Sequence, residues 1–202
     1  MIIRNMEELD KAYEAVEMLR ELDLPVSKEL LENIDRLEKK SGTIHRDDLR
    51  SYFYEQYFAY YTKRILNIRQ AKIRGEVIVA KPVLLLAIIE GIDSNVFMSN
   101  EFQLTEWLEK RYVLLMQKNM HHSQFDKPTD ISNPFWHLQT DGFWHLQYIE
   151  NFEVSATPSK RWLTENVKFA YLDDELWLLL QNDFWRKNLH DYIIEHKLTN
   201  GK

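Results

Sequence analysis

Apolar residues recur every three or four positions over most of the first 70 residues, which is the period of amphipathic helices. The pattern predicts three helices, at about residues 5–22, 28–40 and 47–71. Asn5 and Ser27 are suited to cap the first two helices, because their side-chain oxygens can accept hydrogen bonds from free amide groups. We therefore expect an antiparallel helical pair followed by one long helix.

The predicted third helix carries a stripe of aromatic residues that includes Tyr52, Phe53, Tyr57 and Tyr61. Rings at helical spacing usually pack against neighbouring helices. The same rings could instead form a platform on which nucleic-acid bases stack. We expect packing and keep base stacking as the alternative.

The second half of the chain also favours helices. They are expected at about residues 83–92, 104–117, 159–168, 175–181 and 183–196, with short extended segments at 76–79 and 96–98. The helix at 83–92 follows Pro82 and is apolar on nearly every side, which is typical of a helix at the centre of a domain.

A five-residue sequence, Phe-Trp-His-Leu-Gln, occurs at residues 135–139 and again at 143–147. Alternating side chains on both sides of Asp141-Gly142 predict a β-hairpin. The expected fold class is mainly α with a small β-hairpin or sheet (α+β). A helical amino-terminal region, residues 1–74, is expected to pack as an extension on a helical core domain, residues 75–202.

The composition describes a globular protein. The 202 residues are 45% hydrophobic and include no cysteine, which excludes disulfides, thiolate zinc sites and cysteine nucleophiles. The acidic start does not resemble a signal peptide, and the longest apolar run, residues 82–89, is too short to span a bilayer. We expect a cytoplasmic protein with no membrane partner.

The charge is unevenly distributed along the chain. The net charge is −6, yet residues 60–82 carry six Lys or Arg against one Asp or Glu. Nucleic-acid phosphates require such local positive charge. The alternative is a solvated helix end that pairs with the acidic amino-terminal helices.

No motif of a nucleotide-binding loop, a nucleophile elbow or a paired-carboxylate metal site is found, so we expect neither an enzyme nor a cofactor. A metal-dependent enzyme is kept as an alternative because histidines and an aspartate cluster along one segment. These residues are His121, His122, Asp126, His137 and His145.

Three short blocks carry a family resemblance. They are Ala80–Leu86, Asn133–Leu138 followed closely by Asp141–Trp144, and Ala170–Trp177. In this order they resemble the sulfur-binding domain of modification-dependent restriction endonucleases, which recognises phosphorothioate-modified DNA and usually precedes an HNH nuclease. The resemblance covers about residues 75–197, and after the last expected helix no room is expected for a nuclease.

The resemblance implies where DNA is contacted. In that family a basic residue before the helix-starting proline contacts the DNA backbone beside the sulfur, and Lys81, preceded by Ala80, matches it here. A shallow sulfur pocket is built partly around the proline that matches Pro134. Asn133 precedes that proline, and His137 stands three residues after it, where a small residue is expected.

Other cations could add phosphate contacts while base edges set sequence preference. These are Lys72, Arg74, Lys160 and Arg161. The leading hypothesis is a nuclease-lacking module that binds DNA, with or without phosphorothioate modification. Its role would be defence or the sensing of modified DNA, and it would act alone or with a separate effector protein. The rival hypothesis is a protein-interaction or oligomerisation module that binds no nucleic acid.

Overall fold

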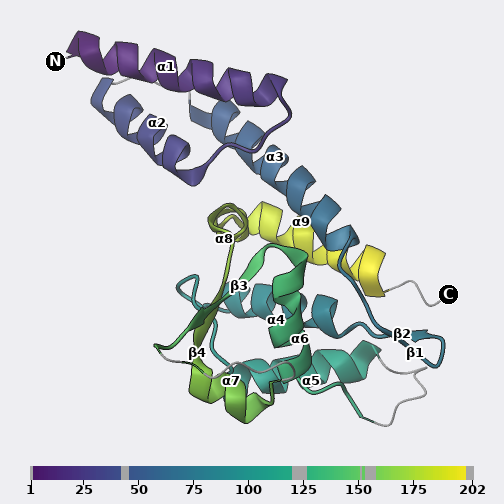
Figure 1. Ribbon diagram of the computed structural model, residues 1–202. Helices are drawn as coiled ribbons and strands as arrows, with labels where there is room; N and C mark the ends of the chain where they lie inside the picture. The colour runs from purple at the N-terminus through teal and green to yellow at the C-terminus, as the bar shows by residue number, and fades with distance from the viewer. Residues whose placement is uncertain (1, 42–45, 120–126, 151, 153–157, 199–202) are drawn as a thin grey trace. The chain divides into compact units, whose positions relative to one another are not determined.

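The computed structural model describes residues 2–41, 46–119, 127–150, 152 and 158–198, shown as a ribbon in Figure 1. The chain divides into two compact units, Met1–Tyr60 and Tyr61–Lys202. Helices dominate both units and the second adds two small antiparallel sheets, so the expected mainly helical α+β class is confirmed. Among the described residues, no helix has the length and apolar character needed to cross a bilayer.

The first unit contains α1 (Ile2–Glu21), α2 (Lys28–Ser41) and most of α3 (Arg46–Leu66). Ser27 caps α2 as expected, because its Oγ accepts a hydrogen bond from the Leu30 amide at 3.2 Å. The helices α1 and α2 pack against each other. Apolar side chains form the buried core of this unit: Leu9, Ala12, Val16, Val26, Ile34, Leu37 and Tyr57.

The tyrosines of α3 whose side chains are described lie partly in the core. Tyr57 is fully buried and donates its hydroxyl to the Val26 carbonyl, and Tyr61 is buried as well. The packing interpretation is therefore confirmed for these two rings. Helix α3 ends at Leu66 rather than at residue 71. There the Ile68 amide donates to the Ile65 carbonyl at 3.2 Å, an i→i−3 bond that tightens the last turn, and the Asn67 side chain donates to the Lys63 carbonyl at 3.0 Å.

Helix α4 (Ala80–Asp93) is the central element of the second unit. It is buried along most of its length and contacts α5 (Glu106–Asn119), α6 (Ser132–His137), α8 (Asp174–Gln181) and α9 (Asp183–Ile193). Figure 1 shows these helices arranged around it. Pro82 lies in the first turn, where its missing amide hydrogen removes no helical hydrogen bond. The central position predicted from its apolar surface is confirmed.

A two-stranded hairpin precedes α4. Strand β1 (Lys72–Ile73) pairs antiparallel with β2 (Glu76–Val77), and only β2 lies within the extended segment expected at residues 76–79. Arg74 and Gly75 connect the strands with φ values of 52° and 84°. Two successive positive φ angles are typical of a tight hairpin turn.

The expected hairpin of the repeated sequence is wrong. The first copy forms α6 and the 3₁₀ turn η1 (Leu138–Asp141), while the second copy forms β3 (Trp144–Tyr148). Asp130 explains the helical start, because its Oδ1 accepts from both the amide and the hydroxyl of Ser132. Gly142, with φ of 80°, ends η1 in the left-handed conformation instead of turning a hairpin.

The true partner of β3 is β4 (Val167–Leu172), which pairs Trp144 with Leu172 in antiparallel register. The helix expected over residues 159–168 ends at Asn166, as α7 (Lys160–Asn166), and β4 follows directly. No strand forms at the described residues 96–98, where Phe97 instead turns into the core. The chain closes with α9 and the π-helical turn η2 (Ile194–Leu198).

Trp144 connects the two copies of the repeat inside the core. Its Nε1 donates to the Phe135 carbonyl at 2.9 Å, and the two rings meet edge to face at 5.3 Å between centroids. Phe102 stacks on the other side of Trp144 at 5.7 Å. The duplicated residues therefore pack against each other as helix and strand.

Candidate nucleic-acid interface

The three sequence blocks that carry the resemblance converge in the second unit. The first block supplies the start of α4, the second supplies α6, η1 and the start of β3, and the third supplies the end of β4 and the start of α8. The Asp173 amide donates to the Phe143 carbonyl at 3.1 Å, which joins the third block to the second. Lys81 in the first block pairs with Asp141 in the second.

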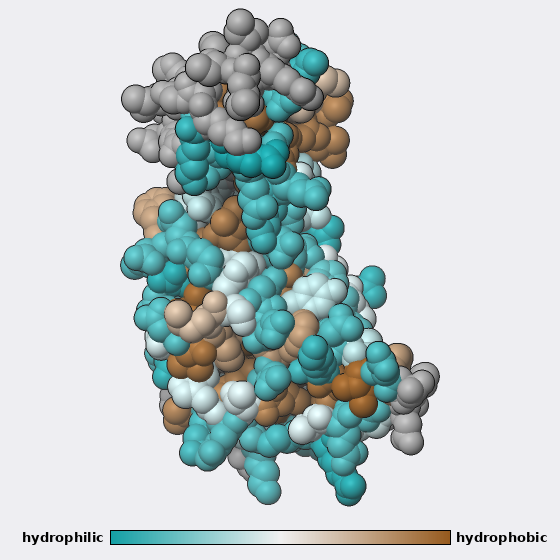
Figure 2. Space-filling view, turned by 90° about the vertical axis from the view of Figure 1, so that its left-hand side faces the viewer, coloured by the Kyte–Doolittle hydropathy of each residue, from teal (hydrophilic) through white to brown (hydrophobic). Residues whose placement is uncertain are grey.

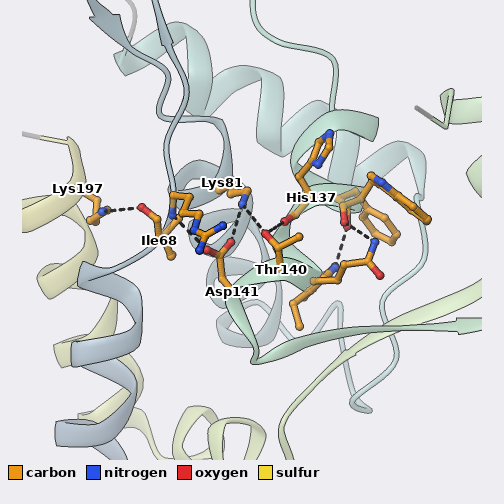
Figure 3. A network of polar contacts seen from close by, with 11 residues as sticks. Ile68, Lys81, His137, Thr140, Asp141 and Lys197 are labelled. Atoms are coloured by element: carbon orange, nitrogen blue, oxygen red, sulfur yellow. Dashed lines mark hydrogen bonds and ion pairs between the residues drawn. The ribbon is translucent and has the colours of Figure 1, made fainter. Parts of the chain in front are cut away.

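Lys81 and Asp141 form the centre of a polar network, shown in Figure 3. The Lys81 Nζ lies 2.6 Å from the Asp141 Oδ2 and 3.4 Å from the Thr140 hydroxyl. Thr140 in turn donates to the His137 carbonyl at 2.8 Å. The Lys81 side chain is 13% exposed and that of Asp141 is 4% exposed, so the pair reaches solvent mainly through the lysine.

Further groups surround the turn at residues 141–142. The Arg69 amide donates to the Asp141 Oδ1 at 3.2 Å, and the Arg64 Nη1 donates to the Gly142 carbonyl at 2.9 Å. Lys197 donates to the carbonyls of Leu66 and Ile68, the second of which is drawn in Figure 3. Burial lowers the pKa of Lys197, and attraction to Asp141 partly opposes that shift. Positive charge therefore gathers around one buried carboxylate.

The segment that matches the family's sulfur pocket lies on α6. Asn133 is exposed, Pro134 is buried and His137 is half-buried at the end of the helix. His137 joins the network through its backbone carbonyl, and Figure 3 shows its imidazole pointing away from Lys81. The surface beside Lys81 is thus formed by backbone and by Thr140 rather than by the histidine ring.

The hairpin residues Lys72 and Arg74 are both exposed. Arg74 sits at the tip with φ of 52°, a conformation that non-glycine residues adopt rarely. Neither side chain has a hydrogen bond or ion pair with the residues that the structure describes. These two cations are therefore open to an external anion.

The cations proposed on α7 have carboxylate neighbours. Lys160 pairs with Glu109 of α5, and Arg161 pairs with Glu165 one helical turn away at 2.8 Å. The Arg161 side chain is 86% exposed, so its ion pair is weak and its guanidinium can exchange partners. Lys160 is more enclosed and would have to leave Glu109 to meet a phosphate.

The histidines considered as metal ligands are not assembled within the described structure. His121, His122 and Asp126 lie outside the described residues, and the described part of the chain holds no cluster of three metal-ligating side chains. His145 instead pairs with Asp173, with 2.6 Å between its Nε2 and the Asp173 Oδ1. Asp173 also accepts the Tyr61 hydroxyl at 3.0 Å, which makes this a local hydrogen-bonded group.

Sequence reasoning missed three members of the polar cluster: Arg64, Asp141 and Lys197. The sequence predicts Asp141 as a turn residue of a hairpin, whereas its pairing with Lys81 spans 60 positions in the chain. Arg64 belonged to the basic stretch but was not assigned a contact. The sequence did contain one indication that Asp141 lies near Lys81, since both residues belong to the blocks that carry the resemblance.

Comparisons with known proteins agree with the resemblance. The family model described as ScoMcrA-like, DNA sulfur-binding domain, matches residues 60–200. A search of the curated proteins gives no match. The matched range begins one residue before the second compact unit and includes all of its described elements.

Proposed function

This chain belongs to the ScoMcrA-like DNA sulfur-binding domain family, and from that premise we propose that it recognises phosphorothioate-modified DNA. Residues 60–200 are a DNA-binding module of that family. The proposal goes further in naming the modified linkage as the preferred ligand and modified-DNA sensing or defence as the setting. The observation that carries it is that the three sequence blocks meet in the second unit, the first and second through Lys81 and Asp141, the second and third through Phe143 and Asp173.

The proposed contact surface begins at the amino terminus of α4. Val79 caps this helix without a side-chain hydrogen bond, and in our proposal the Lys81 amide of the first turn meets a phosphate oxygen. Lys81 lies in the same turn and retains limited exposure. A phosphate placed here would meet one ammonium group and the positive end of a helix.

Sulfur recognition would use the neighbouring α6. A sulfur that replaces a non-bridging oxygen is larger, softer and less hydrated, so an apolar surface discriminates against it less than against oxygen. Pro134 lies on the buried side of α6, while Asn133 is exposed, so its side-chain amide can reach DNA. In our proposal, His137 stands at the position where the family has a small residue, and its imidazole, which points away from Lys81 in Figure 3, leaves the surface beside the lysine open.

Phosphates further along the duplex would meet Lys72 and Arg74. Both are exposed on the β1–β2 hairpin. Lys160 and Arg161 on α7 would add contacts after exchanging their carboxylate partners for phosphates. Contacts of this kind give affinity and register, whereas base-edge contacts give sequence preference.

The proposal is tested by a salt titration of binding to one short duplex, with and without a single phosphorothioate linkage of defined stereochemistry. We expect tighter binding to the modified duplex, and the difference should disappear in Lys81→Ala. Equal affinity for both duplexes would reject sulfur recognition and leave general DNA binding. Failure to bind either duplex at low salt would reject the proposal altogether.

A second candidate function, protein interaction, is favoured by the surface of the first unit. Met18, Leu22 and Leu24 are strongly exposed near the end of α1. In the face shown in Figure 2, apolar side chains also gather in separate patches among hydrophilic ones. Exposed apolar patches mark many interaction sites. A mass that increases with protein concentration, and that Leu22→Glu abolishes, would support this function.

A further inference from the structure

Asp141 is the acceptor at which the polar network of the second unit meets. Its Oδ2 accepts from the Lys81 Nζ at 2.6 Å, and its Oδ1 accepts from the Arg69 amide at 3.2 Å. Its side chain is only 4% exposed. The carboxylate is thus fixed from two sides and cannot turn away from Lys81 without losing both hydrogen bonds.

The geometry limits what Lys81 can offer to DNA. An ammonium group has three N–H donors. One is directed to Asp141 and a second to the Thr140 hydroxyl, which lies 3.4 Å from the Nζ (Figure 3). One donor is left for a ligand, and its direction is set by the other two.

The pair also has no net charge. A cation in the first turn of a helix opposes the helix dipole, and the Asp141 carboxylate compensates for Lys81 at the start of α4. In a phosphorothioate, negative charge is drawn toward sulfur and the remaining oxygen is less anionic. An unpaired ammonium at that oxygen would therefore favour the unmodified phosphate, whereas a neutral pair that donates one N–H would not.

We infer that Asp141 is a positioning residue that sets the preference for the modified linkage by neutralising and orienting Lys81. The inference rests on the proposed function. It assigns to Asp141 a role in specificity, exerted by weakening the attraction of Lys81 to ordinary phosphate. Removing the carboxylate should increase affinity for ordinary DNA while it reduces the preference for sulfur.

The first arm of the test needs no DNA. Reductive methylation followed by peptide mass spectrometry measures how readily each lysine reacts. In the wild-type protein we expect Lys81 to react much more slowly than the exposed Lys72. In Asp141→Asn, Lys81 should react clearly faster than in the wild-type protein, although its 13% exposure keeps its rate below that of Lys72. An unchanged rate would overturn the claim that Asp141 holds Lys81.

The second arm compares binding of the full chain to the modified and unmodified duplexes over a range of salt. Asp141→Asn should lower the ratio of the two affinities and steepen the salt dependence by about one unit, because one additional phosphate charge is neutralised. A wild-type ratio and slope in this variant would overturn the inference and leave the proposed function intact. If the wild-type protein binds neither duplex, both fail.

Two controls separate positioning from damage. Asp93→Asn removes a carboxylate that pairs with Arg186 elsewhere in the second unit, and it should change neither lysine reactivity nor the affinity ratio. The double variant Lys81→Gln with Asp141→Asn replaces the pair by two neutral amides. Because this double variant buries no unpaired charge, it should fold even if Asp141→Asn alone does not. Its salt slope should equal that of the wild-type protein. A slope that falls by about one unit would show that Lys81 acts as a full charge and would overturn the inference.

Discussion

Arg64 donates from its Nη1 to the Gly142 carbonyl at 2.9 Å, across 78 positions of the chain. This hydrogen bond joins the end of α3 to the turn that follows Asp141. Gly142 has φ of 80°, which a glycine adopts without strain. The turn that places Asp141 beside Lys81 therefore depends on one glycine and one arginine.

We predict that Gly142→Ala destabilises the second unit by about 2 kcal/mol, from backbone strain together with loss of the Arg64 hydrogen bond. A Cβ at this position would lie 2.4 Å from the Arg64 Nη1, so the guanidinium must move away. The free energy of unfolding from urea denaturation measures the effect.

Gly75→Ala is the matched control for that prediction. Gly75 has a similar φ of 84°, but a Cβ there would have no atom within 4 Å. The control therefore reports backbone strain alone, and Gly142→Ala should cost about 1 kcal/mol more. Equal losses in the two variants would mean that the Arg64 hydrogen bond contributes nothing to stability.

Gly91 provides a second steric prediction. It lies in the buried part of α4, and a Cβ there would approach the Phe97 ring to 2.4 Å and Trp107 to 3.0 Å. Gly91→Ala should lower the free energy of unfolding by about 1–3 kcal/mol, although alanine is the better helix former. Thermal and urea denaturation would measure the loss.

The rescue variant for Gly91→Ala is Phe97→Leu, which removes part of the ring that the new methyl group meets. The double variant should be more stable than the sum of the two single losses predicts, because the residues are in contact. Strict additivity would show that the clash with Phe97 is not the cause.

The helices could be predicted because their signals are local. Ser27 accepts an amide hydrogen bond at the start of α2, as its position in the sequence predicts, whereas Asn5 lies inside α1 because that helix already begins at Ile2. The nearly continuous apolar character of residues 83–92 likewise required a central helix. Each signal lies within a few residues of the feature it predicts.

The repeated pentapeptide shows where local signals fail. Identical residues form a helix at 135–137 and a strand at 144–147, so the alternating pattern alone does not determine the structure. The strand is determined by β4, which pairs Trp144 with Leu172. Because that partner lies 28 residues away, the sheet depends on tertiary packing rather than on the repeat.

The candidate site was predictable only in part, for the same reason. The blocks of the resemblance pointed to Lys81, Pro134 and Asn133 as separate positions. The partners of the cations are distant in sequence, as with Asp141 for Lys81 and Glu109 for Lys160. The fold therefore decides which cations are neutralised by a carboxylate. The remaining cations are the ones that are open to DNA.

Tyr112 makes stability sensitive to alkaline pH. Burial, aided by the nearby Asp130 carboxylate, raises its pKa well above the ordinary value. Below pH 10 the phenol is protonated in both folded and unfolded chains and contributes no pH dependence. Above pH 10 the unfolded chain loses the proton first, so stability should fall by up to about 1.4 kcal/mol per pH unit.

Tyr112→Phe tests that assignment. At neutral pH it should cost about 1 kcal/mol, because the hydroxyl donates to the Thr129 carbonyl at 3.0 Å. Above pH 10 the variant should lose stability less steeply than the wild-type protein. Tyr148→Phe is the comparison, since burial raises that pKa too but the ring is only half-buried. Parallel alkaline losses in Tyr112→Phe and wild type would contradict the prediction.

The β1–β2 hairpin gives the prediction that bears most directly on DNA binding. Lys72 and Arg74 are exposed and have no described side-chain partner, whereas Arg161 already pairs with Glu165. Replacing Lys72 and Arg74 together by Gln should weaken binding to all duplexes alike and reduce the salt slope by about two units. Fluorescence anisotropy over a range of salt measures both quantities.

Arg161→Gln is the matched variant for the hairpin, because it also removes one exposed cation. Its slope should change by less than one unit, since the Glu165 carboxylate already offsets part of that charge. The hairpin variant should leave the preference for the modified linkage intact, because phosphate contacts carry no information about sulfur. A loss of preference in the hairpin variant would place sulfur recognition at β1–β2 rather than beside Lys81, and an unchanged slope would remove the hairpin from the DNA interface.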